Sequence, residues 1–338
     1  DRRQRQMCIR DSADKMGVSK STVSKALNDA PDISEALRKQ VLETAVALGY
    51  TKLRRYKKPT KKVCIIIEKE NMRYQEPHHF AYDILVGFRQ MAEPAGFDVE
   101  IVPVDIKTQR SQHYDVFMLE HDYIGAFVVG FSLSDPWIQD FKISRTPAVL
   151  FDNYIVGNPS TAYVGIDNEE GMELAVSYLA GLGHRKIAYL SSSLGARVLQ
   201  ARHAAFLRSM HQHGLKTSPA AIGCSYYLSE CMEKHLPRFL ENGITAIICN
   251  QDTLASATLT QCQQLGFQVP DDISIIGFDD LPIAACTSPP LTTIRQDRLE
   301  LGKSGFFALS SLLNHIPIST YLLHAQLIQR ESTRKIPL

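Results

Sequence analysis

Residues 13–28 read ADKMGVSKSTVSKALN, and this stretch decides how the N-terminal part of the chain folds. Apolar residues at helical spacing predict one helix over about residues 9–16 and a second over about residues 20–28. Gly17, between them, suits the left-handed backbone that ends a helix, and Ser19 is a natural N-cap for the helix that follows. The stretch therefore predicts two helices joined by a tight turn.

The second helix has an apolar face for the core and a polar face for solvent. Its polar positions, with the cap, are Ser19, Lys20, Ser21, Thr22, Ser24, Lys25 and Asn28. Lysine donates to guanine base edges, and hydroxyls and helix N-terminal amides suit phosphate oxygens. This pattern is typical of a helix-turn-helix that places its second helix in the DNA major groove. A third helix is expected between a Ser34 cap and Gly49.

Charge is divided unevenly along the chain. Residues 1–62 hold 16 Lys/Arg and 7 Asp/Glu, a net of +9, whereas the remainder holds 21 and 29, a net of −8. A basic head on an acidic body fits a head that binds nucleic acid. Residues 51–62 carry seven Lys or Arg, and Pro59 interrupts any helix there. We predict that this linker binds phosphates.

Composition excludes several classes of protein. Apolar residues make up 44% of the 338 residues, and no apolar run approaches the ~18–20 residues of a membrane span. The N-terminus lacks the apolar stretch of a signal peptide, so a cytoplasmic protein without membrane partners is expected. Seven cysteines without a C-x-x-C pair predict reduced thiols. No cofactor is predicted, and the adjacent His78 and His79 lack a dedicated set of metal ligands.

Residues 63–338 alternate short apolar runs with amphipathic stretches of helical length. Strands are expected at 63–67, 99–104, 126–129, 148–151, 186–190, 246–249 and 273–276. Helices are expected at 82–95, 169–182, 199–213, 230–241, 253–265 and 297–314. This alternation predicts an α/β body of parallel sheets covered on both faces.

The body has more predicted strands and helices than a single covered sheet usually holds, so it is expected to form two doubly wound subdomains. The predicted domains are a head at 1–50, a linker at 51–62 and a body at 63–338. Within the body, the N-subdomain covers about 63–155 plus 293–318, and the C-subdomain covers about 160–288 plus 320–335. The chain is expected to cross between them near 153–163 and 282–292.

In open parallel sheets, ligands bind beyond the carboxyl ends of the strands. Charged, polar and aromatic residues that follow the expected strands are therefore candidates for a binding site. They are Phe80, Asp152, Arg202, Tyr226, Gln251, Asp252 and Asp279. Carboxylates and a guanidinium bind vicinal hydroxyls in pairs, and aromatic rings cover the apolar faces of sugars. The set predicts a sugar or sugar derivative as ligand.

The head resembles the DNA-binding head of the lactose-repressor (LacI/GalR) family of bacterial transcription regulators. The matching segments are Gly17–Ser19, Thr22–Asn28 and Ala47–Tyr50. The body resembles the same family over 164–168, 181–190, 269–280, 289–294 and 330–333, and such bodies share a periplasmic-binding-protein architecture with a small molecule between two lobes.

The resemblance implies roles for individual residues. Base edges would be contacted by Lys20, Ser21 and Lys25. Phosphates would be held by Ser19, Thr22, Ser24 and Asn28. A minor-groove wedge could come only from Leu53, because the linker is shorter than the family's usual hinge. The effector would be contacted by Arg202, Asp252, Asp279 and Asp152, with Phe80 and Tyr226 as stacking faces.

The resemblance also implies a function: a repressor that binds a pseudo-palindromic operator as a homodimer and responds to a carbohydrate effector. It does not decide whether the effector releases DNA or promotes binding. The alternatives are a non-catalytic sugar-binding protein and an α/β enzyme. No phosphate-binding G-x-x-x-x-G-K-[ST] loop or G-x-S-x-G elbow is present, so an enzyme is not expected.

The extreme N-terminus departs from the family. Residues 7–12 resemble the translation of an adapter used in preparing DNA sequencing libraries. Ser12 stands where the family places an apolar residue on the inner face of the first helix. We expect residues 1–12 to replace a native start, and we assign no function to them.

Overall fold

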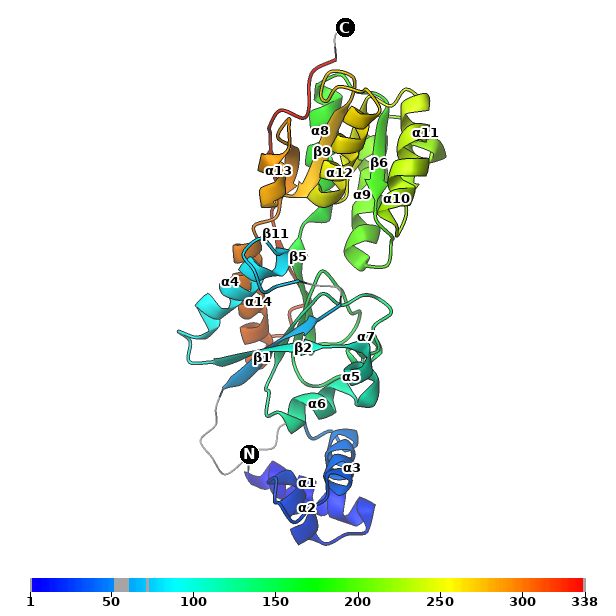
Figure 1. The fold of residues 1–338 in the computed structure, drawn as a ribbon. Coiled ribbons are helices and arrows are strands. Elements are labelled where there is room, and N and C mark those ends of the chain that lie inside the picture. Colours follow the sequence, from blue (N-terminus) through cyan, green and yellow to red (C-terminus); the bar gives the residue numbers. More distant parts are fainter. Residues whose placement is uncertain (1, 52–60, 71–72, 337–338) are drawn as a thin grey trace. The chain divides into compact units, whose positions relative to one another are not determined.

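The computed structural model of the chain describes residues 2–51, 61–70 and 73–336 (Figure 1). The described chain forms two compact units. Unit 1 comprises Asp1–Arg73, Leu85–Val164 and Gly302–Tyr321, and unit 2 comprises Tyr74–Ile84, Gly165–Leu301 and Leu322–Leu338. None of the helices within the described ranges is long and apolar enough to cross a membrane.

The head consists of three helices, as the sequence predicts: α1 (Arg2–Met16), α2 (Lys20–Leu27) and α3 (Glu35–Ala47). Its small core contains Val23, Ala26, Leu27, Val41, Leu42 and Ala45. The first helix begins well before residue 9, the expected start. Its buried face continues toward the N-terminus through Cys8 and Arg5, which are 0% and 9% exposed.

Unit 1 carries a six-stranded sheet in the order β11-β5-β4-β3-β1-β2. Its strands are β1 (Lys62–Glu68), β2 (Asp98–Val104), β3 (Ala126–Val129), β4 (Ala148–Phe151), β5 (Thr161–Ile166) and β11 (Thr320–Leu323). Ile65 in β1 lies opposite Ile101 in β2 and Phe127 in β3, and both pairings are parallel. The β-branched run of β1 is buried, as expected for the interior of a parallel sheet.

Helices accompany this sheet. They are α4 (Phe80–Ala92), α5 (Ile106–Ser111), α6 (Tyr114–Glu120), α7 (Trp137–Asp140) and α14 (Arg298–Leu313). An aromatic group of Tyr114, Phe117, Trp137 and Phe141 packs beneath the strands in one apolar cluster. Aromatic pairs in offset or edge contact stabilise such a core beyond the area that they bury.

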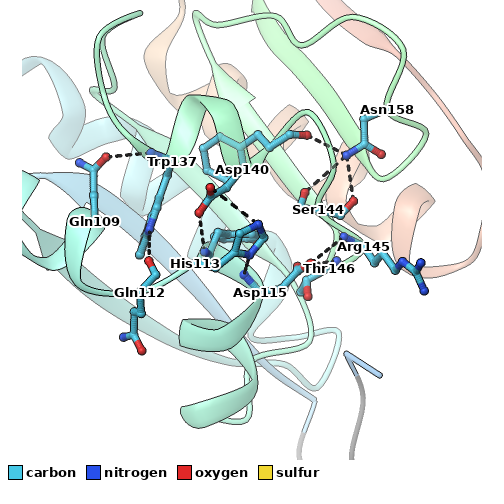
Figure 2. A network of polar contacts seen from close by, with 12 residues as sticks. Gln109, Gln112, His113, Asp115, Trp137, Asp140, Ser144, Arg145, Thr146 and Asn158 are labelled. Carbon is cyan, nitrogen blue, oxygen red and sulfur yellow. Dashed lines mark hydrogen bonds and ion pairs between the residues drawn. The ribbon is translucent and has the colours of Figure 1, made fainter. Parts of the chain in front are cut away.

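Buried and half-buried polar side chains fix α6 and the segment that precedes β4 (Figure 2). The Asp115 carboxylate accepts hydrogen bonds from the backbone amides of Arg145 and Thr146, both at 3.0 Å. Asp140 accepts from the backbone amide of Tyr114 at 2.8 Å, and Asn158 donates to the carbonyl of Ser144 at 2.8 Å. These bonds satisfy backbone groups that would otherwise be buried without partners.

Unit 2 carries a second six-stranded sheet in the order β12-β10-β9-β8-β6-β7. Its strands are β6 (Ile187–Ser191), β7 (Ile222–Cys224), β8 (Ala246–Cys249), β9 (Ser274–Asp279), β10 (Thr292–Arg295) and β12 (Gln326–Ile328). All recorded pairings are parallel except that of β10 with β12. The helices are α8 (Asn168–Gly181), α9 (Arg197–Gln212), α10 (Leu228–Glu230), α11 (Leu236–Glu241), α12 (Asp252–Gln264) and α13 (Pro282–Cys286), with a π-helical turn at Cys231–His235.

The two doubly wound sheets confirm the predicted fold class, but the chain crosses between them elsewhere than expected. Residues 161–163, the end of the expected crossing at 153–163, belong to β5 of the first sheet, so the first crossing lies later than expected. Residues 292–295 form β10 of the second sheet, so the second crossing lies later than 282–292. Both strands are short and flanked by Thr, Gly or Pro. They lack the apolar run that marks a buried strand, so the sequence pattern did not predict them.

The seven cysteines are free thiols, in agreement with the expectation of reduced thiols. Five are buried, whereas Cys224 and Cys286 are exposed. Burial raises the pKa of Cys262 to about 12, so its thiol stays protonated and unreactive at neutral pH.

Candidate functional site

Helix α2 presents a polar face on the head. Lys20, Ser21 and Lys25 are exposed, whereas Val23 and Leu27 are buried in the core of the head. The sequence predicted this division from helical spacing. The three exposed side chains are therefore free of the core and accessible to DNA.

The turn before α2 fixes how the helix begins. Gly17 has a φ of +66°, in the left-handed region that favours glycine. Ser19 is the N-cap, and its hydroxyl accepts a hydrogen bond from the backbone amide of Thr22 at 3.0 Å. The Ser19 and Thr22 hydroxyls also lie 2.9 Å apart. Both hydroxyls thus stand at the positive end of the helix, where phosphates bind.

Two predicted contact residues have partners within the head. The Lys25 ammonium pairs with Asp32 at 2.5 Å, and this hydrogen bond lowers the pKa of the Asp32 carboxyl. Exposed ion pairs are weak, so Lys25 can exchange this partner for DNA. The Asn28 side chain donates to the carbonyl of Ser24 at 2.7 Å and accepts from Arg5 at 2.6 Å. Asn28 therefore caps α2 in this structure. Leu53, the predicted wedge, lies outside the described residues.

The second candidate site lies in unit 2, at the carboxyl ends of β6, β8 and β9. These strands are neighbours in the sheet, so the residues that follow them converge at one edge. The hub is Arg202 of α9, whose residue is 3% exposed. Its guanidinium donates to the Asn168 side chain at 2.8 Å and to the carbonyl of Asn250 at 2.7 Å.

Arg202 also neutralises a buried carboxylate. Its Nη1 lies 3.5 Å from Oδ1 of Asp279, and the guanidinium carbon lies 3.7 Å from the centre of the Phe278 ring. Burial raises the pKa of Asp279, and the charge of Arg202 opposes that rise. Gln296 donates to Asp279 Oδ1 at 2.5 Å, while its own Oε1 is buried without a hydrogen-bond partner among the described residues.

Asp252 has no exposed surface and is bound on both carboxylate oxygens. Oδ2 accepts from the backbone amide of Leu281 at 2.7 Å, and Oδ1 lies 2.6 Å from the Thr293 hydroxyl. Burial, and then the charge of Asp279, raise the pKa of Asp252 to about 8. Asp252 thus joins α12 to β10 and the segment after β9.

The other predicted effector residues are dispersed. Gln251 is half-buried at the start of α12, and Phe80 is half-buried at the start of α4. Tyr226 follows β7, is 78% exposed and makes an edge contact with Tyr227. Asp152 follows β4 in unit 1 with a φ of +58°. The structure brings Arg202, Asp252 and Asp279 together.

Sequence reasoning missed two side chains of this cluster. Gln296 follows β10, a strand that was not expected, so nothing marked it. Asn168 follows β5, whose first three residues were expected to belong to a crossing. Each stands directly after the end of a strand. The rule that ligands bind beyond the carboxyl ends of parallel strands would have found both, had the strands been recognised.

The loop before α4 brings three possible metal ligands together. Glu76, His78 and His79 each offer a ligand atom, and these atoms lie within 4.8 Å of one another. Sequence reasoning noted only the histidine pair. In the structure, His79 Nδ1 accepts from the Glu76 amide at 3.2 Å, and His78 Nδ1 lies 3.4 Å from the Glu76 carboxylate. The three residues therefore partner one another.

Comparison with known proteins assigns both parts of the chain. The family model described as bacterial regulatory proteins, lacI family, matches residues 8–52, which include α2. The model of a periplasmic binding protein-like domain matches residues 176–333, which include Arg202, Asp252 and Asp279. The chain therefore carries a lacI-family DNA-binding head and a periplasmic-binding-protein-like body. Both halves of the resemblance drawn from the sequence are thereby confirmed.

Known transcriptional repressors and regulators match the chain over almost its whole length. The HTH-type transcriptional repressor PurR of Aliivibrio salmonicida is 27% identical over 339 residues, covering 97% of this chain and 99% of that protein. A transcriptional regulator CelR–cellobiose complex has a TM-score of 0.71 at 22% identity, covering 96% and 99% of the two chains. A lac repressor dimer bound to operator and the anti-inducer ONPF has a TM-score of 0.67 at 22% identity, covering 96% and 98%.

Proposed function

We propose that this LacI-family chain is a repressor that binds a pseudo-palindromic operator as a homodimer. Binding of a carbohydrate in the body would either lower or raise its affinity for the operator. One observation carries the proposal: the exposed Lys20, Ser21 and Lys25 face of α2 stands on the same chain as the buried Arg202–Asp279 cluster. The first suits base edges and the second suits a polar ligand.

The chemistry of the cluster supports a hydroxyl-rich effector. Asp279 supplies acceptor oxygens, Arg202 supplies donors, and Gln296 Oε1 is a buried acceptor. A hydroxyl group both donates and accepts, so one sugar hydroxyl can satisfy a donor and an acceptor at once. Relatives also point this way, since a similar fold binds cellobiose and another binds operator DNA as a dimer.

DNA binding is tested by the affinity of the full chain for the DNA upstream of its own gene, measured by fluorescence anisotropy. We expect Lys20→Ala to weaken specific binding by roughly tenfold or more, because a good base contact contributes about 1–3 kcal/mol of discrimination. Lys15→Ala, an exposed change on α1, is the matched control and should leave affinity within about twofold. Equal effects of the two changes, or no specific binding by the wild type, would refute the proposal.

Effector binding is tested by thermal shift with a panel of mono- and disaccharides. A sugar that occupies the cluster should raise the melting temperature of the wild type, because a ligand that binds only the folded state stabilises it. The shift should vanish in Asp279→Asn and persist in Asp271→Asn, whose carboxylate is 60% exposed. The same sugar should change the operator affinity of the wild type. If no sugar shifts the wild type, the carbohydrate assignment fails while DNA binding stands.

A further inference from the structure

Helix α6 of unit 1 is buried on more than one side. Six of its seven residues, Tyr114 to Leu119, are buried. Tyr114, Phe117 and Met118 belong to the apolar cluster beneath the first sheet. Val116 and Leu119 belong instead to the apolar cluster of the head and are only 2% and 6% exposed. We call these two side chains the docking face of α6.

The docking face meets the third helix of the head. Helix α3 packs against α6, and its Val41, Leu42 and Ala45 share one apolar cluster with Val116 and Leu119. Without this cover, two adjacent apolar side chains of a surface helix would face water, which is unfavourable. The partner of the docking face is therefore a segment of this same chain.

Polar contacts flank the apolar contact at both ends of α3. The Lys39 ammonium, in its first half, donates to the carbonyl of Ser111 at 2.8 Å. At its C-terminal end, Arg145 Nη1 lies 3.4 Å from the carbonyl of Gly49. Gly49 has a φ of +88° and ends the helix, where carbonyls lack helical partners and favour cations.

The body holds α6 and Arg145 in a fixed relation. Asp115 of α6 binds the backbone amides of Arg145 and Thr146, as Figure 2 shows. His113 Nδ1 accepts from the amide of Asp115 at 3.1 Å, which caps the start of the helix. The docking face and the Arg145 contact are thus parts of one rigid frame.

We propose that the head docks through α3 on α6 of its own chain. This contact, together with the linker, sets the orientation of α2, the recognition helix proposed to enter the DNA major groove. Lys20, Ser21 and Lys25 stay exposed in the docked head, so docking leaves the DNA-binding face open. A shift of α6 then moves the head directly. This consequence rests on the proposed function, whereas the docking itself does not.

The test is hydrogen exchange of the full chain without DNA, followed by mass spectrometry. Leu119→Ser removes apolar cover from the docking face, and we expect peptides from α3 to exchange at least several-fold faster. Ile143→Ser is the matched control, because Ile143 is 74% exposed on the same unit. It should leave α3 exchange unchanged. Peptides from β3 report whether unit 1 remains folded.

Arg145→Gln gives a second, independent variant. The Arg145 side chain is exposed, so unit 1 should fold normally while the bond to Gly49 is lost. We expect faster exchange at the C-terminal end of α3 with no change in β3. If Leu119→Ser also speeds exchange in β3, Arg145→Gln alone tests whether the head docks on α6. Unchanged α3 exchange in a folded Arg145→Gln chain, and in Leu119→Ser, would overturn the docking.

Failure of docking and failure of the proposed function give different results. Protected α3 in a chain that binds no operator would retain docking and refute the repressor assignment. Operator binding by a chain whose α3 exchange is indifferent to both variants would retain the repressor and refute docking.

Discussion

Single residues set the chemistry of the buried cluster around Arg202, Asp252 and Asp279. Asp252 and Asp279 are two buried carboxyls, and the guanidinium of Arg202 pairs with Asp279. Since burying two negative charges together is unfavourable, one of them holds its proton more tightly. Burial and the charge of Asp279 raise the pKa of Asp252 to about 8, so Asp252 mostly keeps its proton at pH 7.

This protonation makes stability depend on pH. In the unfolded chain an aspartate titrates near about pH 4, so between about pH 4 and 8 only the folded chain keeps the proton of Asp252. The contribution is fully present below about pH 4 and is lost as the pH rises through the folded-state value. Asp252→Asn mimics the protonated acid: its carbonyl accepts from Leu281 and its amide donates to Thr293.

We expect the urea midpoint of Asp252→Asn to fall less steeply between pH 5 and about 8 than that of the wild type. Asp271→Asn removes an exposed carboxylate and should keep the wild-type slope. Circular dichroism at several pH values measures both. A wild-type slope in Asp252→Asn would show that Asp252 is not the titrating group.

Gly277 explains why Asp252 has room. A Cβ at position 277 would lie 2.1 Å from Asp252 Oδ1 and 3.3 Å from the Thr293 hydroxyl. We predict that Gly277→Ala destabilises the chain by about 1–3 kcal/mol, since overpacking in a core costs about that much. Gly181→Ala is the control, because a Cβ there meets nothing within 4 Å. Thermal unfolding should show a loss only for Gly277→Ala.

At the scale of the element, the start of α2 combines folding and binding. The Ser19 hydroxyl caps the helix through Thr22, and the Ser34 hydroxyl caps α3 through Leu37 at 3.3 Å. We predict that Ser19→Ala and Ser34→Ala each destabilise the head by about 1 kcal/mol. Only Ser19→Ala should weaken operator binding further, because only Ser19 lies on the binding face. Hydrogen exchange and anisotropy separate the two effects, and an equal loss of affinity would contradict the phosphate role.

The sequence predicted some residues of the buried cluster in unit 2 and missed others, depending on the element that carries them. Arg202 and Asp279 were predictable because β9 is a long apolar run and α9 has a clear helical period. Gln296 was not, because β10 has four residues and follows two prolines. A short strand in the middle of a sheet gains its stability from neighbours distant in sequence, and local pattern does not record them.

The docking face was missed for a related reason. Apart from Asp115, residues 114–119 are apolar, and periodicity alone cannot say that Val116 and Leu119 face another domain. The recognition helix, by contrast, was predictable down to its exposed residues, because its cap, turn and apolar face are all local signals.

On the scale of the whole molecule, the basic linker joins head and body. Lys61 lies over the Phe97 ring, and Lys62 pairs with Glu100 at 2.7 Å, so the body engages both. Replacing Lys57 and Lys58 by Gln should therefore reduce the salt dependence of DNA binding more than replacing Lys61 and Lys62. Each lost phosphate contact lowers the slope of log affinity against log salt by roughly 0.9. Lys57 and Lys58 lie outside the described residues, so this expectation rests on sequence and charge.

Anisotropy titrations at four salt concentrations measure these slopes. The two double variants remove the same charge and thus control for each other. Equal slopes in both variants and in the wild type would show that the linker does not bind phosphates.

Neither sheet is made from one continuous length of chain. The first ends with β11 at residues 320–323 and the second with β12 at residues 326–328, whereas the head is complete by residue 50. On the ribosome, the head therefore emerges and can fold long before either sheet receives its last strand. Since domains fold as they are synthesised, nascent chains pass through a stage in which the DNA-binding head is folded and the body is still incomplete. Premature termination would produce a DNA-binding fragment whose body lacks the last strand of both sheets.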